Sequence, residues 1–154
     1  MKVIDNLCVE NTRILFRNFK GEKTKYNKDG KRTFCVVLPN DIAQKAADEG
    51  WNVHILAPRD PEDKPVHYIQ TEVTYEFYPP KVWLVTKNNK TLLDESTIGE
   101  LDYADIRNVD VILRPYVWTM DDRTGIKAYV KTMYVTIEED QFAQKYAEEE
   151  FPEE

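Results

Sequence analysis

Aromatic and basic side chains alternate in two β-prone runs toward the C-terminal end of the sequence. The first run carries Arg114, Tyr116 and Trp118, and the second carries Lys127, Tyr129 and Lys131. Side chains two residues apart in a strand point to the same face, so each set shares one face if its run is a strand. Aromatic rings stack on bases while Lys and Arg neutralise phosphates, and single-stranded nucleic acid needs both. The two sets therefore predict a nucleic-acid-binding face.

A long β-hairpin would bring these two sets together. Residues 108–137 form two runs rich in Val, Ile, Tyr, Trp and Thr around residues 121–125, a polar segment that ends in a glycine. If Met120 pairs with Gly125, the cross-strand pairs are Trp118 with Lys127, Tyr116 with Tyr129, and Arg114 with Lys131. Tyr and Trp are favoured in strands of any function, so the hairpin alone does not decide what the protein does.

Cations are concentrated in the N-terminal part of the sequence. Residues 1–38 hold nine Lys/Arg and four Asp/Glu, although the whole chain has a net charge of −7. We expect a strand at residues 12–19 and a long polar loop at residues 20–32. Such a loop is either simply solvated or a cationic arm that closes over a nucleic-acid backbone. The candidate binding residues here are Arg13, Arg17, Lys20, Lys23, Lys25, Tyr26, Lys28, Lys31 and Arg32.

Acidic residues are concentrated at the other end. Residues 138–154 hold eight Asp/Glu and one Lys, and residues 148–154 read EEEFPEE. Opposite charge at the two ends suggests nucleic-acid contact together with an acidic interaction tail. A purely solubilising tail does not need an apolar residue, so Phe151 is the candidate partner-binding residue.

The sequence lacks the residue patterns on which most enzymes and metal sites depend. It contains no phosphate-binding G-x-x-x-x-G-K loop and no G-x-G-x-x-G fingerprint. Cys8, Cys35, His54 and His67 do not show the short paired spacings of zinc sites, so we expect no metal and no cofactor. No apolar run approaches the ~20 residues of a membrane span. Without a secretory signal the protein is expected in the cytoplasm, with both cysteines as free thiols.

The remaining patterns predict a mainly β protein with short helices. A helix is expected at residues 41–49, with Asn40 as its N-terminal cap and Gly50 as its C-terminal cap. The sequence predicts no helix or strand at residues 1–9. Further strands are expected at residues 33–38, 51–56, 66–77 and 81–86, and further helices at residues 94–101 and 138–146. Many short strands with helical insertions favour one domain, residues 1–147, built as an OB-fold-like Greek-key barrel and followed by the acidic tail.

Four segments resemble a family of small bacteriophage and prophage proteins. They are ILFRNFKGEKTKYNKDGKRTFCVVL, DEGWNVHILAPR, DYADIRNVDVILRPYVW and GIKAYVKTMYVTIEED, and the resemblance covers about residues 10–147. Members of this family are single-stranded DNA-binding proteins of OB-like fold. The resemblance implies a non-enzymatic, sequence-nonspecific protein of DNA replication or recombination in the cytoplasm of a bacterial host. The tail resembles that of replicative single-strand binders, which recruit partners through acids and a Phe, but here Pro152 and two glutamates follow Phe151.

Two other functions remain open at the level of sequence. The first is a phage structural or assembly β-barrel that uses the aromatic face for protein contacts. The second is a metal-dependent nuclease with a carboxylate site, for which Asp60 with Glu62, or Asp102 with Asp105, would be the acids. The sequence also leaves the oligomeric state open, a homo-oligomer included.

Overall fold

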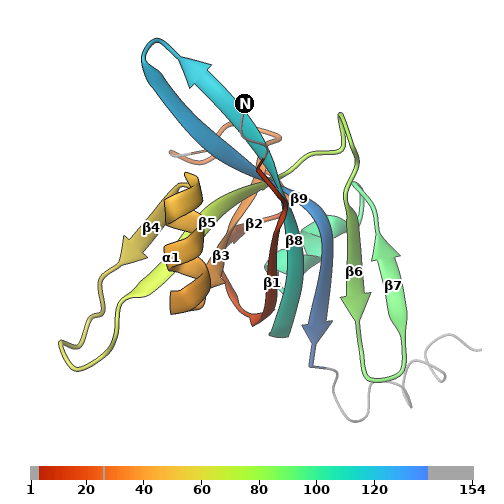
Figure 1. The fold of residues 1–154 in the computed structure, drawn as a ribbon. Helices are drawn as coiled ribbons and strands as arrows, with labels where there is room; N and C mark the ends of the chain where they lie inside the picture. The colour runs from red at the N-terminus through yellow and green to blue at the C-terminus, as the bar shows by residue number, and fades with distance from the viewer. Residues whose placement is uncertain (1–3, 26, 139–154) are drawn as a thin grey trace, which may run out of the picture.

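The computed structural model describes residues 4–25 and 27–138, which form one mixed β-sheet with two short helices (Figure 1). The helices are α1 (Asn40–Glu49) and the 3-10 helix η1 (Ile98–Asp102). The strands are β1 (Leu7–Thr12), β2 (Ile14–Asn18), β3 (Arg32–Leu38), β4 (Val53–Leu56), β5 (Val66–Val73), β6 (Lys81–Val85), β7 (Lys90–Leu93), β8 (Ile106–Met120) and β9 (Arg123–Ile137). The predicted mainly β class with short helices is confirmed. The expected helix at residues 138–146 and the tail lie outside the described residues, apart from Glu138.

The sheet curls until its two ends meet. The strand order is β1-β8-β9-β5-β3-β2, so β1 and β2 lie at opposite ends of the path. Only Arg13 separates them in the sequence, and its carbonyl accepts a 3.1 Å hydrogen bond from the Val37 N–H of β3. One bent N-terminal segment therefore contacts both β8 and β3. Its first half, β1, lies in residues for which the sequence predicted no element, except Thr12, which was expected to begin a strand.

The predicted hairpin is present, but its register differs from the expected one by two residues. Strands β8 and β9 are antiparallel, Met120 pairs with Arg123, and Asp121 and Asp122 form the turn. Lys131 falls at an irregularity, because Ile112 pairs with Thr132 and the next residue, Leu113, pairs with Val130. The tip of the hairpin projects beyond the rest of the sheet (Figure 1).

Strands β5 and β6 both run parallel to β9, with a loop between them. Glu72 of β5 pairs with Tyr129, and Lys81 of β6 pairs with Thr132. Residues 74–80 leave the sheet between these two pairs and carry Phe77 and Tyr78. The expected strand at residues 66–77 therefore ends at Val73, before the Pro79-Pro80 break.

The core follows the alternation of the strands except on β2. Phe34 and Val36 of β3 are fully buried, as is Leu113 of β8. On β2, alternation over residues 12–19 puts Phe16 on one face and Phe19 on the other with the cations Arg13 and Arg17. The structure reverses this, because Phe16 is 61% exposed, whereas Phe19, directly after the strand, is 0% exposed. An irregularity between Leu15 and Asn18 and a φ of +54° at Phe16 explain the reversal.

Helix α1 begins within one residue of its predicted start and ends where predicted, whereas η1 begins at Ile98, four residues after the expected start at residue 94. Helix α1 starts at Asn40 after Pro39 and has no side-chain cap, so Asn40 does not act as the expected cap. Gly50 ends it at a φ of +103°, and its N–H is bonded to carbonyls of the last turn, as predicted. Before η1, the Asp94 carboxylate accepts hydrogen bonds from the backbone N–H groups of Ser96 and Thr97. None of the helices in the described residues is long and apolar enough to cross a membrane.

Candidate nucleic-acid interface

The outward side chains of four adjacent strands form one surface, which we call the outer face. Cross-strand pairs connect Thr33 to Glu72, Glu72 to Tyr129, and Tyr129 to Arg114, so β3, β5, β9 and β8 contribute to the same side of the sheet. The outer face consists of Thr33, Cys35, Tyr68, Gln70, Glu72, Lys127, Tyr129, Arg114, Tyr116 and Trp118. Four of these ten residues are aromatic, and three are charged, namely Glu72, Lys127 and Arg114.

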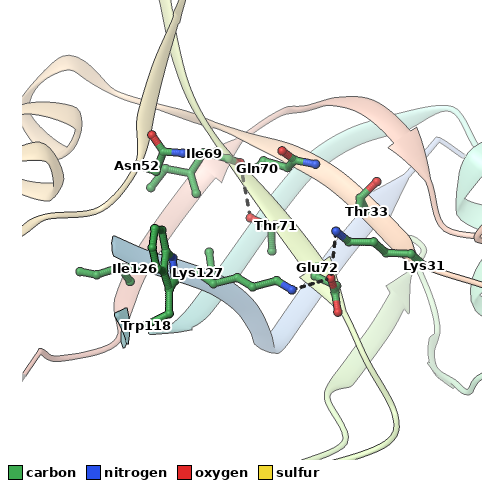
Figure 2. Close-up of a pocket in the computed structure, with 11 residues that line it drawn as sticks. Lys31, Thr33, Asn52, Ile69, Gln70, Thr71, Glu72, Trp118, Ile126 and Lys127 are labelled. Carbon is green, nitrogen blue, oxygen red and sulfur yellow. Dashed lines mark hydrogen bonds and ion pairs between the residues drawn. The ribbon is translucent and has the colours of Figure 1, made fainter. Parts of the chain in front are cut away.

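Two hollows follow one another along the outer face. One has a volume of about 820 Å³ and is lined by Phe16, Tyr68 and Tyr103, among others. The other, of about 170 Å³, is lined by Trp118 and residues of β5 and β9 (Figure 2). Thr33 and Gln70 line both hollows. They therefore form one continuous trough across β3 and β5, and Trp118 stands at one end of it.

The indole of Trp118 is held by the residue opposite it. Trp118 pairs with Gly125, and the absence of a side chain at Gly125 leaves the space that the ring fills. The expected partner, Lys127, pairs with Tyr116 instead. Because the register differs by an even number of residues, the aromatic and cationic side chains still share one face.

An aromatic cluster with an arginine lies beside the trough. The Arg114 guanidinium carbon is 4.6 Å from the ring centroid of Tyr78 and 5.9 Å from that of Tyr129. Phe77 and Tyr116 contact the Tyr129 ring edge-on, at centroid distances of 5.6 and 6.2 Å. Tyr78 is 74% exposed and Tyr116 is 55% exposed, but Tyr129 is only 7% exposed. Tyr129 thus supports the cluster, and Tyr78 and Tyr116 present the open rings.

A carboxylate lies between two cations in the trough. Glu72 Oε1 is 3.0 Å from Lys127 Nζ and 3.7 Å from Lys31 Nζ, and the two lysines reach it from opposite sides (Figure 2). Burial lowers the pKa of Lys127, but Glu72 and Tyr129 outweigh burial, so the pKa is raised overall. Lys127 therefore stays charged at neutral pH. Glu72 occupies the position that an anionic group of a ligand would take between the lysines.

The far end of the trough holds a second group of rings. Tyr68 contacts Phe16 edge-on at a centroid distance of 5.9 Å and stacks on His54 at 5.2 Å. Beyond them, Lys20 Nζ lies 4.4 Å from the ring centroid of Tyr103. The Lys20 pKa is raised, chiefly by its hydrogen bond to the Tyr103 hydroxyl. Aromatic side chains therefore line the trough at both ends.

The structure brings together only some of the residues that the sequence predicted. Lys31, Arg114, Tyr116, Trp118, Lys127 and Tyr129 lie on or beside the outer face. Arg17 lines the trough, but its guanidinium donates to the carbonyls of Leu101 and Ala104, both at 2.8 Å. Arg32 points elsewhere, toward Glu95, at 3.8 Å.

Other predicted residues lie apart from the outer face or outside the described chain. Arg13 lines a separate hollow with Arg107. Lys131 is exposed at the irregularity of β9 and is not opposite Arg114. Lys23, Lys25 and Lys28 are exposed in the loop before β3. Tyr26 and Phe151 lie outside the described residues.

Sequence reasoning missed several rings of this site. Phe16 fell in the strand expected at residues 12–19 and Phe77 at the end of the one expected at residues 66–77, and neither was given a binding role. Tyr78 and Tyr103 lie in connections that show no periodic pattern. Tyr68 was the one with a usable signal, because it alternates with Gln70 and Glu72 on one face of β5. In the described residues no cluster of three or more His, Cys, Asp or Glu is arranged to hold a metal ion.

Comparison with known proteins gives a family and a fold. Residues 1–154 match the family model described as "Putative phage ssDNA-binding domain". The fold is similar to the single-stranded DNA-binding protein of bacteriophage Enc34 in complex with ssDNA, with a TM-score of 0.59 and 14% identity over 89% of each chain. A C-terminally truncated form of the Enc34 protein gives a TM-score of 0.57 at 14% identity, over 88% of this chain and 87% of that chain. No curated protein sequence matches the chain.

Proposed function

The chain belongs to the phage ssDNA-binding domain family, and we propose that it binds single-stranded DNA in the trough of the outer face. The observation that carries this proposal is the pairing of exposed rings with cations on one surface. Arg114 lies against Tyr78, Lys127 is opposite Tyr116, and Trp118 closes the trough. Bases would stack on the rings, and the lysines and arginine would contact phosphates.

We infer that the curled sheet is an OB-like barrel. The bent segment of β1 and β2 forms both ends of the strand path by pairing with β8 and β3, and β5 runs parallel to β9 within the path. Small barrels of this kind bind oligonucleotides on the surface of their central strands. The trough lies on β3 and β5, both of which are interior strands of the path, so its position supports this inference.

The proposed role is non-enzymatic and independent of base sequence. Every base has a π-face, so stacking tolerates any sequence. Most cations of the outer face lie close to rings or to Glu72, an arrangement suited to holding a strand. We place this role in DNA replication or recombination in the cytoplasm of a bacterial host. Recruitment of partner proteins by the acidic tail is part of the same proposal, with Phe151 as the contact residue.

Titration of fluorescent oligo-dT and of a matched duplex, at two salt concentrations, tests this function. Single strands should bind more tightly than duplex, and binding should weaken as salt rises because counterions are released. Trp118→Ala should lower affinity by about 1–3 kcal/mol if a base stacks there. Thr119→Ala is the matched control, since Thr119 pairs with Thr124 on the opposite face of the hairpin.

Three results would contradict the proposal. Equal affinity for single strand and duplex would exclude stacking as the main interaction. A salt-independent affinity would favour the assembly-protein alternative. Loss of the oligonucleotide on incubation with magnesium would instead indicate a nuclease.

A further inference from the structure

A second pair of stacked rings lies outside the trough. Trp83 of β6 and Tyr134 of β9 are cross-strand partners, with ring centroids 6.3 Å apart and an interplanar angle of 8°. Lys90 Nζ of β7 lies 4.5 Å from the Trp83 centroid and 5.8 Å from the Tyr134 centroid. Tyr134 is 37% exposed, and Trp83 is half-buried. This Trp83–Tyr134–Lys90 cluster has the same chemistry as the trough.

The cluster lies on the same side of β9 as the outer face. Met133 and Val135 point into the core, as do Ala128 and Val130 on the other side of the irregularity at Lys131. Tyr134 therefore points outward, as Tyr129 does. They are five positions apart in the sequence, which is about 16 Å along a strand. The loop that carries Phe77 and Tyr78 leaves the sheet between them, so rings follow β9 from its first half to its second.

The charge near the cluster suits a polyanion. Residues 81–93 contain three lysines and no carboxylate, although the chain as a whole has a net charge of −7. The nearest cross-strand acid is Asp110, which pairs with Tyr134. Its Oδ1 accepts a 2.8 Å hydrogen bond from the Asn11 N–H, and this single carboxylate stands against the three lysines. A phosphate beside Lys90 would therefore meet mainly positive charge.

We propose that the Trp83–Tyr134–Lys90 cluster is a second binding site for the same DNA strand. A base stacks on the exposed surface of the ring pair, and Lys90 contacts a neighbouring phosphate. The strand leaves the trough near Tyr78 and continues along β9 and β6. This inference rests on the proposed function, and it predicts that the strand must be long enough to span both sites before the cluster contributes.

A protein partner is the competing occupant of this surface. Leu92, the cross-strand partner of Trp83, is exposed and would extend an apolar contact. The local charge favours DNA over a protein partner. Residues 81–93 contain three lysines and no carboxylate, and a contact surface for an apolar partner does not need such an excess of positive charge. A protein partner would leave DNA binding unchanged when the cluster is altered, so the same experiment separates the two occupants.

The test is the affinity of the full chain for oligo-dT over a series from about 4 to 16 nucleotides. Trp83→Ala should leave the affinity for the shortest oligomers unchanged and weaken the longest by about 5- to 150-fold, the range for one stacked base. Thr91→Ala is the matched control, since Thr91 is exposed on the other face of the β6–β7 hairpin, opposite Leu84. Lys90→Gln should make the slope of log affinity against log salt concentration shallower by about 0.7, again for long oligomers only.

Each outcome separates the two proposals. If Trp83→Ala binds oligo-dT of every length as tightly as the wild-type chain does, the second site is overturned and the proposed trough site is unaffected. An equal loss at every length would also overturn it, because the ring would then support the fold or the trough. Failure of the wild-type chain to bind any oligomer would remove the proposed function itself. Thermal unfolding of each variant verifies that the fold persists.

Discussion

The indole of Trp118 occupies the space directly above Gly125, its partner on the opposite strand. A Cβ on Gly125 would lie 2.5 Å from Cζ2 of the ring and 2.7 Å from Cε2, distances that no real contact allows. Gly125 does not have a positive φ, so its backbone tolerates other residues. The glycine is therefore required by the ring and not by the turn.

Gly125→Ala should displace the Trp118 ring without breaking the hairpin. The backbone accepts alanine, but the new methyl group pushes the ring away from the trough. We expect a loss of oligo-dT affinity close to that of Trp118→Ala, about 1–3 kcal/mol. Thr124→Ala, one residue earlier and exposed, is the control. Full affinity together with an unchanged melting temperature would show that Trp118 does not contact DNA.

Glu72→Gln should tighten DNA binding. The Glu72 carboxylate pairs with Lys31 and Lys127 in the free protein, and phosphates bound in the proposed trough site would compete with it. Removing its charge makes both lysines available, so affinity should rise and the salt slope should become steeper. Glu62→Gln changes the same charge in the exposed loop before β5 and serves as the control. Weaker binding by a folded Glu72→Gln variant would show that the carboxylate orients the lysines for DNA.

Neutralising the loop lysines should flatten the salt dependence. Lys23 and Lys28 are exposed in the loop that borders the trough. Replacing both with Gln should make the slope of log affinity against log salt shallower by about 1.4, if each lysine neutralises one phosphate. Replacing Lys45 and Lys64, which are exposed on α1 and in the loop before β5, gives the same change in net charge. Equal slopes for the two double variants would place the strand away from the loop.

Removal of residues 148–154 should tighten DNA binding at low salt. The segment holds five glutamates and no cation, and a tethered polyacid stays at high effective concentration near a cationic face. The effect should shrink as salt screens charges over ~10 Å at 0.1 M. A full-length variant with the five glutamates changed to Gln separates charge from length. Identical affinities for oligo-dT at low salt with and without residues 148–154 would show that the tail does not compete with DNA.

The two cysteines should differ in reactivity. Cys8 is exposed, whereas Cys35 is buried in the trough wall, and burial raises the pKa of its thiol to about 11. The thiolate is the reactive form, so at pH 8 a thiol reagent should modify Cys8 much faster. Bound oligo-dT should slow Cys35 further, which can be measured in a Cys8→Ser variant. A Cys35 rate that DNA leaves unchanged would argue against a strand in the larger hollow.

The hairpin shows which features a sequence pattern can predict. Alternation placed Arg114, Tyr116 and Trp118 on one face, and they are on one face in the structure. The predicted register was wrong by two residues because the turn uses Asp121 and Asp122, not the longer polar segment. An even error keeps every side chain on its face, so the composition of the outer face was predictable although the pairs were not.

Backbone irregularities account for much of what the sequence did not reveal. Phe16 turns outward because the chain adopts a positive φ there, and a simple alternation places it in the core. Tyr78, also at a positive φ, is presented by a loop that leaves the sheet. The position of Glu72 between two lysines depends on how three separate segments pack. Local periodicity carries no information on such contacts.

The closure of the sheet by its N-terminal segment bears on how the protein is made. Leu7 pairs with Leu113, so β1 must wait for β8 to leave the ribosome before it finds its partner. A nascent chain would expose an unpaired β1 during most of its synthesis, and such non-local pairing slows folding. Trp118 and Lys127 also arrive with these last strands. A chain interrupted before β8 would therefore lack both the closure of the fold and the strands that carry Trp118 and Lys127 of the proposed binding surface.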